Sequence, residues 1–410
     1  MTRSAPDSCP GVLRLHQAAD GPLARIRLPG GVLLPDQLRA LAEAARELGN
    51  GDIELTSRGN VQLRRMHDAD ALAARLEAAG LLPSPTHERV RNIIASPLSG
   101  RVGGWTDVHA LVPELDARLR AAPGLAELPG RVLFTLDDGR GDVSGLGGDI
   151  GVHAVGADEY ALVLGGRDSG IRVPGADALD ALLAAAHAFQ ELRGEQWRLH
   201  EIDDGPARVA ARLGLDATAR PLEFGASHDI PIGWLTQSDG RVALGAGVPL
   251  GSLPARTAEF VAAVDHPIIV TPWRSLVVAD LGESPAEQVV RVLAPMGLIF
   301  DANSPWLLVT ACAGKPGCAK SRTDVRADAA AAVATGRVAA GPSDSDPNGG
   351  LTLSDGTDAH SGLAADAVEV AGRQHWSGCE RRCGRPRGAL TDIVAAPGGY
   401  RITPAHHRTR

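Results

Sequence analysis

The stretch Ile53-Glu-Leu-Thr-Ser-Arg-Gly-Asn-Val-Gln-Leu63 has a counterpart later in the chain, Ile268-Ile-Val-Thr-Pro-Trp-Arg-Ser-Leu-Val-Val278. Thr56 matches Thr271 at an offset of 215 residues, and the helices expected after each stretch end at glycines 217 residues apart. Chance similarity between common strand–helix patterns is the alternative, but four elements in matched order at a nearly constant offset disfavour it. The repeat therefore predicts a pseudo-twofold molecule in which two related halves pack together.

Each copy reads as strand, helix, strand, helix. In the first copy, residues 21–28 alternate apolar and polar as a half-buried strand does, and Pro35 then opens a helix. We interpret 52–63 as the second strand and 68–79 as the second helix. A larger module follows each copy, with expected helices at 108–121, 176–192 and 324–334, and strands at 131–137, 149–155, 160–165 and near 391–395.

Four of the five cysteines form two close pairs, Cys312 and Cys318 with C-x5-C spacing, and Cys379 and Cys383 with C-x3-C spacing. Two such pairs on two loops can surround one metal centre, which suits a [4Fe–4S] cluster or a structural zinc. Zinc ribbons prefer C-x2-C knuckles, so the wider spacings favour the cluster. Unliganded thiols or a disulfide are further alternatives. We interpret Cys9 as a bystander in a loose N-terminal tail.

Composition limits the class of protein. The chain has 410 residues, of which 44% are hydrophobic and 22% charged, as in a globular protein of two or three domains. A net charge of -8 argues against a nucleic-acid partner. No apolar run is long enough to predict a membrane span, and the N-terminus lacks an apolar signal core. Clustered cysteines in a non-secreted chain then predict a cytoplasmic location.

Cationic residues in the first half suggest an anion site. Arg58 lies in the repeated stretch, and Arg89 and Arg91 would share one face if they belong to a strand. Arginine binds a carboxylate through two parallel hydrogen bonds, and Gly59 allows a flat ligand to approach closely. The pattern favours a polycarboxylate macrocycle or a small oxyanion. A solvated basic face is the alternative. The second half reads Thr271-Pro272-Trp273-Arg274 here, so we expect one copy to keep the site.

These residues resemble a known superfamily. Thr56-Ser-Arg-Gly-Asn-Val-Gln-Leu63, Arg89-Val-Arg-Asn-Ile-Ile-Ala-Ser-Pro-Leu-Ser-Gly100 and the two cysteine pairs are similar to those of the sulfite/nitrite reductases, and the resemblance covers about the whole chain. Within the superfamily, the short length and the Ser377-Gly378-Cys379 context most resemble the precorrin-3B synthase family, the cobalamin-pathway branch.

The resemblance implies an α+β fold with a duplicated sulfite/nitrite-reductase-like arrangement, in which two ferredoxin-like half-domains pack pseudo-symmetrically beside two larger α/β modules. We expect half-domain 1 at 12–86, the first reductase-like module at 87–215, a linker at 216–237, half-domain 2 at 238–303 and the iron–sulfur module at 304–405. Residues 341–350 read as a surface insert between the cysteine pairs.

The resemblance also implies roles for individual residues. Cys312, Cys318, Cys379 and Cys383 would be the cluster ligands. Arg58 and Arg91 match superfamily arginines that face the substrate or the tetrapyrrole, and Arg131 matches one of two active-site lysines, the other falling at Leu133. The expected catalytic residues are thus Arg58, Arg91 and Arg131, and the expected substrate-binding residues are Arg58, Asn60, Arg89, Arg91 and Asn92.

The implied activity is a monooxygenase that hydroxylates precorrin-3A with lactone formation. It would use O2, reduced nicotinamide as ultimate electron donor, a [4Fe–4S] cluster and a mononuclear non-haem iron, with a reductase or ferredoxin as partner. We expect a monomer, because the repeat already supplies twofold packing. The alternatives are a sirohaem-dependent sulfite or nitrite reductase, in which Cys383 bridges cluster and sirohaem, and a non-catalytic iron–sulfur or zinc protein.

Overall fold

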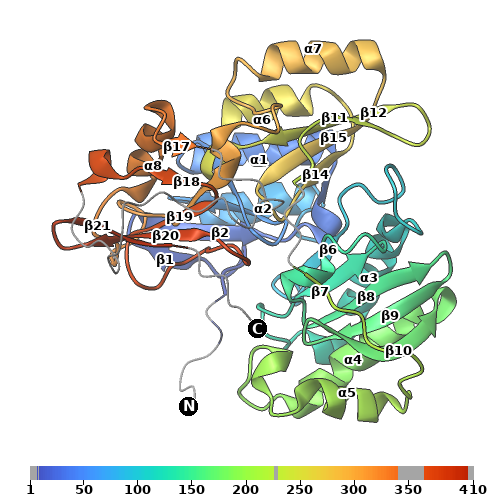
Figure 1. Ribbon diagram of the computed structural model, residues 1–410. Coiled ribbons are helices and arrows are strands. Elements are labelled where there is room, and N and C mark those ends of the chain that lie inside the picture. The colour runs from blue at the N-terminus through green and yellow to red at the C-terminus, as the bar shows by residue number, and fades with distance from the viewer. Residues whose placement is uncertain (1–6, 8, 226–229, 340–363, 405–410) are drawn as a thin grey trace, which may run out of the picture.

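The first half of the chain builds a five-stranded antiparallel sheet. The computed structural model describes residues 7, 9–225, 230–339 and 364–404 (Figure 1). In this sheet the strand order is β1-β2-β5-β4-β13. Its members are β1 (His16–Ala18), β2 (Gly21–Ile26), β5 (Val61–Arg64), β4 (Asp52–Leu55) and β13 (Ser252–Pro254), the last of which comes from the second half.

The second half builds a matching sheet and receives a strand in return. Its order is β11-β12-β15-β14-β3. The members are β11 (Gly233–Thr236), β12 (Val242–Gly247), β15 (Ser275–Leu281), β14 (Ile268–Val270) and β3 (Val32–Leu33). Leu253 of β13 pairs with Ile53, and Leu33 of β3 pairs with Ile268. This exchange of edge strands ties the halves together and gives the pseudo-twofold arrangement that the repeat predicts.

Helices from both halves cover these sheets and share one core. They are α1 (Pro35–Leu48), α2 (Ala69–Ala78), α6 (Ala255–Ala262) and α7 (Glu283–Leu293), and α1 packs beside α6 (Figure 1). Pro35 begins α1 as predicted, and the Asp68 side chain caps α2 by accepting a hydrogen bond from the Ala71 amide. Leu41 and Leu253 are fully buried in the common core, where each such side chain contributes roughly 1.5–3 kcal/mol.

The first module is a mixed sheet covered by helices. Its order is β10-β9-β8-β7-β6, with β6, β7 and β8 parallel and the others antiparallel. The strands are β6 (Ile93–Ala95), β7 (Phe134–Asp137), β8 (Ile150–Gly156), β9 (Glu159–Leu164) and β10 (Arg167–Pro174), and the helices are α3 (Leu111–Ala121), α4 (Ala178–Leu192) and α5 (Gly205–Leu213).

The cysteine-bearing module repeats this pairing pattern. Its order is β16-β19-β20-β21, with three parallel strands followed by an antiparallel one. The strands are β16 (Val309–Ala311), β19 (Gln374–Ser377), β20 (Thr391–Ala396) and β21 (Gly399–Thr403), accompanied by α8 (Val325–Ala334) and the small pair β17 (Val338–Ala339) and β18 (Val370–Ala371). The duplication therefore extends to the modules.

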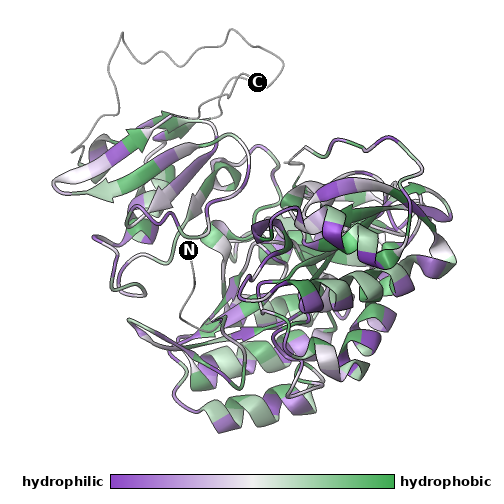
Figure 2. Ribbon diagram, turned by 90° about the horizontal axis from the view of Figure 1, so that it is seen from below, coloured by the Kyte–Doolittle hydropathy of each residue, from purple (hydrophilic) through white to green (hydrophobic). Residues whose placement is uncertain are grey.

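Short 3-10 helices complete the described structure. They are η1 (Pro29–Gly31), η2 (Val108–Ala110), η3 (Pro123–Leu125), η4 (Ser144–Leu146), η5 (Gly175–Asp177), η6 (Leu199–Glu201), η7 (Pro249–Gly251), η8 (Pro305–Leu308) and η9 (Ala365–Ala367). Figure 2 shows hydrophobic and hydrophilic residues alternating along the surface helices, as expected of amphipathic helices that cover sheets. Within the described residues, every helix is too short or too polar to cross a membrane.

The predicted fold class is confirmed, with some local corrections. Residues 52–63 are not one strand, because the turn at Thr56–Asn60 divides them into β4 and β5. Strand β10 and helix α5 were not predicted from the sequence. Cys9 does not lie in a loose tail, since its side chain is buried and its thiol contacts the Gly130 carbonyl oxygen at 3.3 Å. The expected insert at 341–350 falls outside the described residues.

Candidate functional site

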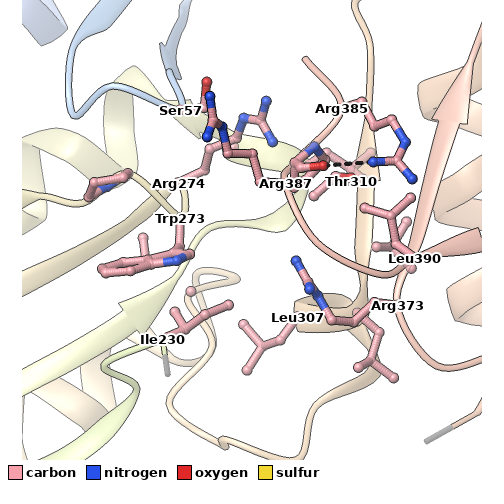
Figure 3. A pocket seen from close by; sticks show the side chains of 18 of the residues that line it. Ser57, Ile230, Trp273, Arg274, Leu307, Thr310, Arg373, Arg385, Arg387 and Leu390 are labelled. Carbon is pink, nitrogen blue, oxygen red and sulfur yellow. Dashed lines mark hydrogen bonds between the residues drawn. The ribbon is translucent and has the colours of Figure 1, made fainter. Parts of the chain in front are cut away.

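A large cavity lies where the two halves and both modules meet. Its interior volume is about 250 Å³, and the empty space is about 1340 Å³ when the open, solvent-filled region is counted. The turn between β4 and β5 contributes Ser57 and Arg58, and the equivalent turn between β14 and β15 contributes Pro272–Ser275. Figure 3 shows side chains entering the cavity from separate elements, among them Ile230, Trp273, Arg274, Leu307, Arg373 and Arg387.

The cavity is strongly cationic. Its lining holds six arginines and, among the described residues, no aspartate or glutamate; the arginines are Arg58, Arg198, Arg274, Arg373, Arg385 and Arg387. Arg198 and Arg385 are already neutralised by ion pairs, with Asp149 at 2.7 Å and Asp392 at 2.9 Å respectively. The remaining wall is largely apolar, with two tryptophans and several leucines. Such a lining favours a large, flat ligand with several carboxylates.

Two of these arginines are desolvated without a carboxylate partner. Arg58 donates to the Arg131 carbonyl oxygen at 3.0 Å, and Arg274 donates to the Gly384 carbonyl oxygen at 3.1 Å. In the described part of the chain, neither forms an ion pair within 4.0 Å, and the carboxylates that act on them, Asp149 on Arg58 and Glu54 on Arg274, do so at longer range. Burial lowers the pKa of each to about 10, helped by the charge of Arg198 near Arg58 and of Arg326 near Arg274. Both remain charged at neutral pH, so an entering carboxylate would supply the missing counter-charge.

Several cavity arginines also connect separate parts of the fold. Arg274 joins the second half to the cysteine-bearing module through Gly384. Arg387 of that module lies against Gly147 of the first module, where a Cβ atom would come within 2.1 Å of its guanidinium. Burial, and then the charge of Arg198, lowers the pKa of Arg387. The cavity walls are therefore held together by the same cations that would bind a ligand.

The four paired cysteines converge beside this cavity. Strands β16 and β19 are parallel neighbours, so their ends lie side by side. Cys312 directly follows β16, and Cys379 lies two residues after Ser377, the last residue of β19. The Gly378 amide donates to the Cys312 sulfur at 3.3 Å. Burial, and then the neighbouring thiols of Cys312, Cys379 and Cys318, raises the pKa of Cys383, so the four sulfurs share one neighbourhood. All four are free thiols.

Glycines allow the two cysteine loops to pack together. A Cβ atom on Gly378 would lie 1.8 Å from the Ser321 Oγ atom, and one on Gly317 would lie 2.6 Å from the Arg64 guanidinium. The Arg322 amide donates to the Gly378 carbonyl oxygen at 3.0 Å, and the Ser321 amide donates to the Cys318 carbonyl oxygen at 3.0 Å. Backbone contacts thus bring the C-x5-C loop onto the C-x3-C loop.

Four cysteine thiolates are the donor set of both metal centres expected from the sequence, a [4Fe–4S] cluster and a structural zinc. Among the described residues, a compact group of three ligand atoms within 4.8 Å of one another is formed by Asp137, Asp138 and Asp142.

The other predicted site residues lie elsewhere, apart from Arg58. The segment around Arg89 is a turn and β6 begins only at Ile93, so the expected shared strand face of Arg89 and Arg91 is wrong. Arg91 is buried against Asp116, and Arg89 donates to the Asp7 carbonyl oxygen at 3.4 Å.

The two predicted asparagines connect the first half to the first module. The Asn60 side-chain Nδ2 donates to the Asn92 side-chain oxygen at 2.9 Å, and the Asn60 side-chain oxygen accepts a hydrogen bond from the Leu28 backbone amide at 2.8 Å. Both side chains are buried away from the cavity lining. Arg131 is half-exposed over the Trp197 ring at 4.7 Å, while Leu133 lines the cavity.

Five cavity arginines were not predicted. Arg385 and Arg387 follow Cys383 closely, so their spacing from the last cysteine was a usable signal. Arg274 occupies the repeat position of Gly59, which marked it as a difference between the copies. Arg198 and Arg373 carry no such signal, because only the packing of separate modules brings them to the cavity.

The fold is similar to that of the sulfite and nitrite reductases. Residues 16–79 match the family described as Nitrite/Sulfite reductase ferredoxin-like half domain. The solved structure of the Mycobacterium tuberculosis NirA protein superposes with a TM-score of 0.71 at 20% identity, covering 93% of this chain and 74% of that one. A ferredoxin–nitrite reductase of Synechococcus elongatus is 31% identical over 191 residues, which are 42% of this chain and 36% of the relative.

A more extensive similarity concerns one particular relative. Precorrin-3B synthase of Sinorhizobium sp. is 26% identical over 405 residues, which cover 96% of this chain and 81% of the relative. The resemblance expected from the sequence is thus confirmed, both to the superfamily and to its precorrin-3B synthase branch. All these relatives are oxidoreductases, and the chain is an enzyme of that class.

Proposed function

We propose that the protein is an iron–sulfur monooxygenase of cobalamin biosynthesis that converts precorrin-3A to precorrin-3B by hydroxylation and lactone formation. The observation that carries the proposal is the arginine-lined cavity directly beside four convergent cysteines. Similarity to precorrin-3B synthase over almost the whole chain supports the same substrate class. Under this proposal, O2 is the oxidant and a reduced nicotinamide is the ultimate donor, acting through a ferredoxin or reductase.

The proposed role of the cavity is to bind and orient the tetrapyrrole. Arg58, Arg274 and Arg387 would each bind a substrate carboxylate, and their fixed positions would determine which edge of the macrocycle faces the cysteine loops. Trp273 and Trp306 supply apolar surface for the ring and exclude water from it. Under the proposed domain division at 12–86, 87–215, 238–303 and 304–405, all four units contribute to this wall.

Cys312, Cys318, Cys379 and Cys383 are the proposed ligands of a [4Fe–4S] cluster, which when bound supplies single-electron transfer. The Gly378 N–H donates a hydrogen bond to the Cys312 sulfur. Hydrogen bonds to the sulfurs are one of the factors that set the reduction potential of an iron–sulfur cluster. Thr310 lines the cavity two residues before Cys312, so the cysteine loops and the substrate wall are continuous. This short path suits electron delivery to the cavity.

The expected mononuclear iron does not fit the residues present. Among the described residues that line the cavity, none is His, Asp, Glu or Cys. The compact aspartate group is already satisfied, because Asp137 accepts four backbone amides, Asp138 binds Arg140 and Asp142 accepts the Ser96 hydroxyl.

The proposal is tested by supplying precorrin-3A, O2 and a reductant to anaerobically purified protein. The expected product is one oxygen atom heavier than the substrate, and an unchanged mass contradicts the proposal.

A sirohaem-dependent reductase is the second candidate, because the same arginines suit a bound sirohaem. Strong Soret and red absorption bands after purification would favour that candidate, whereas a broad brown shoulder would favour the monooxygenase.

A further inference from the structure

The two cavity turns keep the same hydrogen bonds although their sequences differ. In each, the threonine hydroxyl accepts from the amides two and four residues later, at 3.4 and 3.2 Å from Thr56 and at 3.3 and 3.4 Å from Thr271. The amide three residues later donates to the threonine carbonyl oxygen in both. That residue is Gly59 with φ of 62° in the first copy and Arg274 with φ of 59° in the second.

A second pair of equivalent turns shows the same difference. The short helices η1 and η7 precede the exchanged strands β3 and β13. Gly30 has φ of 66° in η1, and its counterpart Leu250 has φ of 52° in η7. The left-handed region is open to glycine but strained for residues with a Cβ atom. The second copy therefore holds two bulky residues in a conformation that the first copy assigns to glycine.

Space around the turns explains why the copies differ. A Cβ atom on Gly59 would lie 3.1 Å from the Val270 carbonyl oxygen and 3.7 Å from the Gly31 Cα atom, neither of which belongs to a residue that lines the cavity. Arg274 instead extends across Gly251, where a Cβ atom would come within 2.7 Å of the arginine Cδ atom. Leu250 and Arg274 both line the cavity, and none of the equivalent first-copy glycines does.

We infer that Leu250 and Arg274 are ligand-binding residues, kept in strained backbone positions because their side chains contact the substrate. This inference rests on the proposed function. The sequence pattern predicted ligand binding by the first copy alone, whereas here the second copy also binds the substrate. Arg274 binds one carboxylate of the tetrapyrrole, and Leu250 contacts the apolar face of the same macrocycle. Strain of this kind is typical of ligand clamps, which the surrounding structure holds in place.

The position of Arg274 also fixes where that carboxylate would lie. The Arg274 guanidinium donates to the Gly384 carbonyl oxygen, one residue after Cys383. A carboxylate bound to its remaining N–H groups is therefore held next to the C-x3-C loop. Arg58 approaches from the equivalent turn of the other half, so the two arginines would bind carboxylates from two sides of the cavity.

The test measures binding of uroporphyrin, a stable polycarboxylate tetrapyrrole, by fluorescence quenching, together with the melting temperature. We expect Arg274→Gly, which reproduces Gly59 of the first copy, to bind at least tenfold more weakly than wild type while melting within a few degrees of it, because relief of the left-handed strain offsets the lost hydrogen bond to Gly384. Leu250→Asn, which tolerates the left-handed region, should bind several-fold more weakly.

Arg65→Gly is the matched control. Arg65 also has a left-handed φ of 57°, but its side chain is 53% exposed and lies outside the cavity. We expect this variant to match wild type in affinity. An Arg274→Gly variant that binds as tightly as wild type overturns the inference and leaves the proposed function intact. A wild-type chain that does not bind uroporphyrin contradicts the polycarboxylate cavity and, with it, the inference.

Discussion

Arg91 and Asp116 form a two-bonded ion pair, with Nε to Oδ1 at 2.5 Å and Nη2 to Oδ2 at 3.0 Å, and both side chains are at most 10% exposed. Arg120 also donates to Asp116, so the carboxylate is fully engaged by the first module. The pair fixes helix α3 to the segment that leads into β6. Arg91, which the motif predicted to bind substrate, therefore stabilises the first module through Asp116.

Arg91→Ala should therefore act on stability and not on ligand binding. Removing Arg91 leaves Asp116 with Arg120 as its remaining partner, and the two lost hydrogen bonds should lower the free energy of unfolding by about 1–3 kcal/mol. Urea denaturation measures this cost, and uroporphyrin titration of the folded variant measures affinity. Unchanged stability with a tenfold loss of affinity would instead make Arg91 a substrate ligand.

Arg58 should show the opposite behaviour. Arg58→Lys keeps the charge but loses the planar pair of donors, so we expect weaker uroporphyrin binding with little change in the urea midpoint. Arg58→Ala should weaken binding further. Arg212→Ala, which removes an exposed partner of Glu191, is the control and should leave affinity unchanged. Equal affinity of all three variants would exclude Arg58 from the binding site.

Gly378 should be required for assembly of the cysteine loops. In Gly378→Ala the new methyl group would overlap Ser321, which costs about 1–3 kcal/mol and displaces the loop that carries Cys379. We expect lower iron and sulfide content after anaerobic purification. Gly156→Ala, with no atom within 4 Å of the added Cβ, is the matched control. Full iron content in Gly378→Ala would show that the loops do not need this close contact.

Asp142 should make stability depend on pH. Burial, and then the charge of Asp137, raises the pKa of Asp142 to about 7, while Ser96 and Arg140 oppose the rise. The pKa of the neighbouring Asp137 is instead held at about 2, by hydrogen bonds from His153 and backbone amides that outweigh its burial. Between about pH 4 and pH 7 the folded chain therefore binds more protons at Asp142 than the unfolded chain.

The contribution of Asp142 to the free energy of unfolding therefore falls as the pH rises from about 4 to about 7. Asp142→Asn cannot ionise, so it should be more stable than wild type by on the order of 1–3 kcal/mol at pH 8, with the difference shrinking toward pH 4. Urea denaturation of both proteins across this range provides the comparison. A difference that does not vary with pH would mean that Asp142 titrates at its ordinary value.

The sequence predicted those features that depend on local spacing or on self-similarity. The constant offset between Thr56 and Thr271 predicted the duplicated halves, and the spacing of Cys312 to Cys383 predicted that the four cysteines lie near one another. Both signals follow from the order of residues along the chain. The same is true of helix α1, whose start at Pro35 follows from a residue that fits the first helical turn.

The sequence could not predict contacts created by the exchange of strands and the meeting of modules. Arg274 reaches the cavity because β14 and β15 pack beside the cysteine module, and Arg198 because the first module closes the opposite wall. Arg91 looked equivalent to Arg58 by motif, but its side chain meets Asp116 of helix α3, which is 25 residues away in sequence. Pairing of this kind depends on tertiary packing, which a short motif does not encode.

We propose that four cysteines hold one iron–sulfur cluster beside the cationic cavity. The most direct test measures iron and acid-labile sulfide in anaerobically purified wild type, Cys383→Ser and Cys9→Ser, with EPR spectra of the reduced proteins. We predict the stoichiometry of one [4Fe–4S] cluster per chain in wild type and in Cys9→Ser, and loss or alteration of the cluster signal in Cys383→Ser. Wild-type protein that contains zinc without sulfide, or Cys383→Ser with an unchanged cluster, would contradict the account.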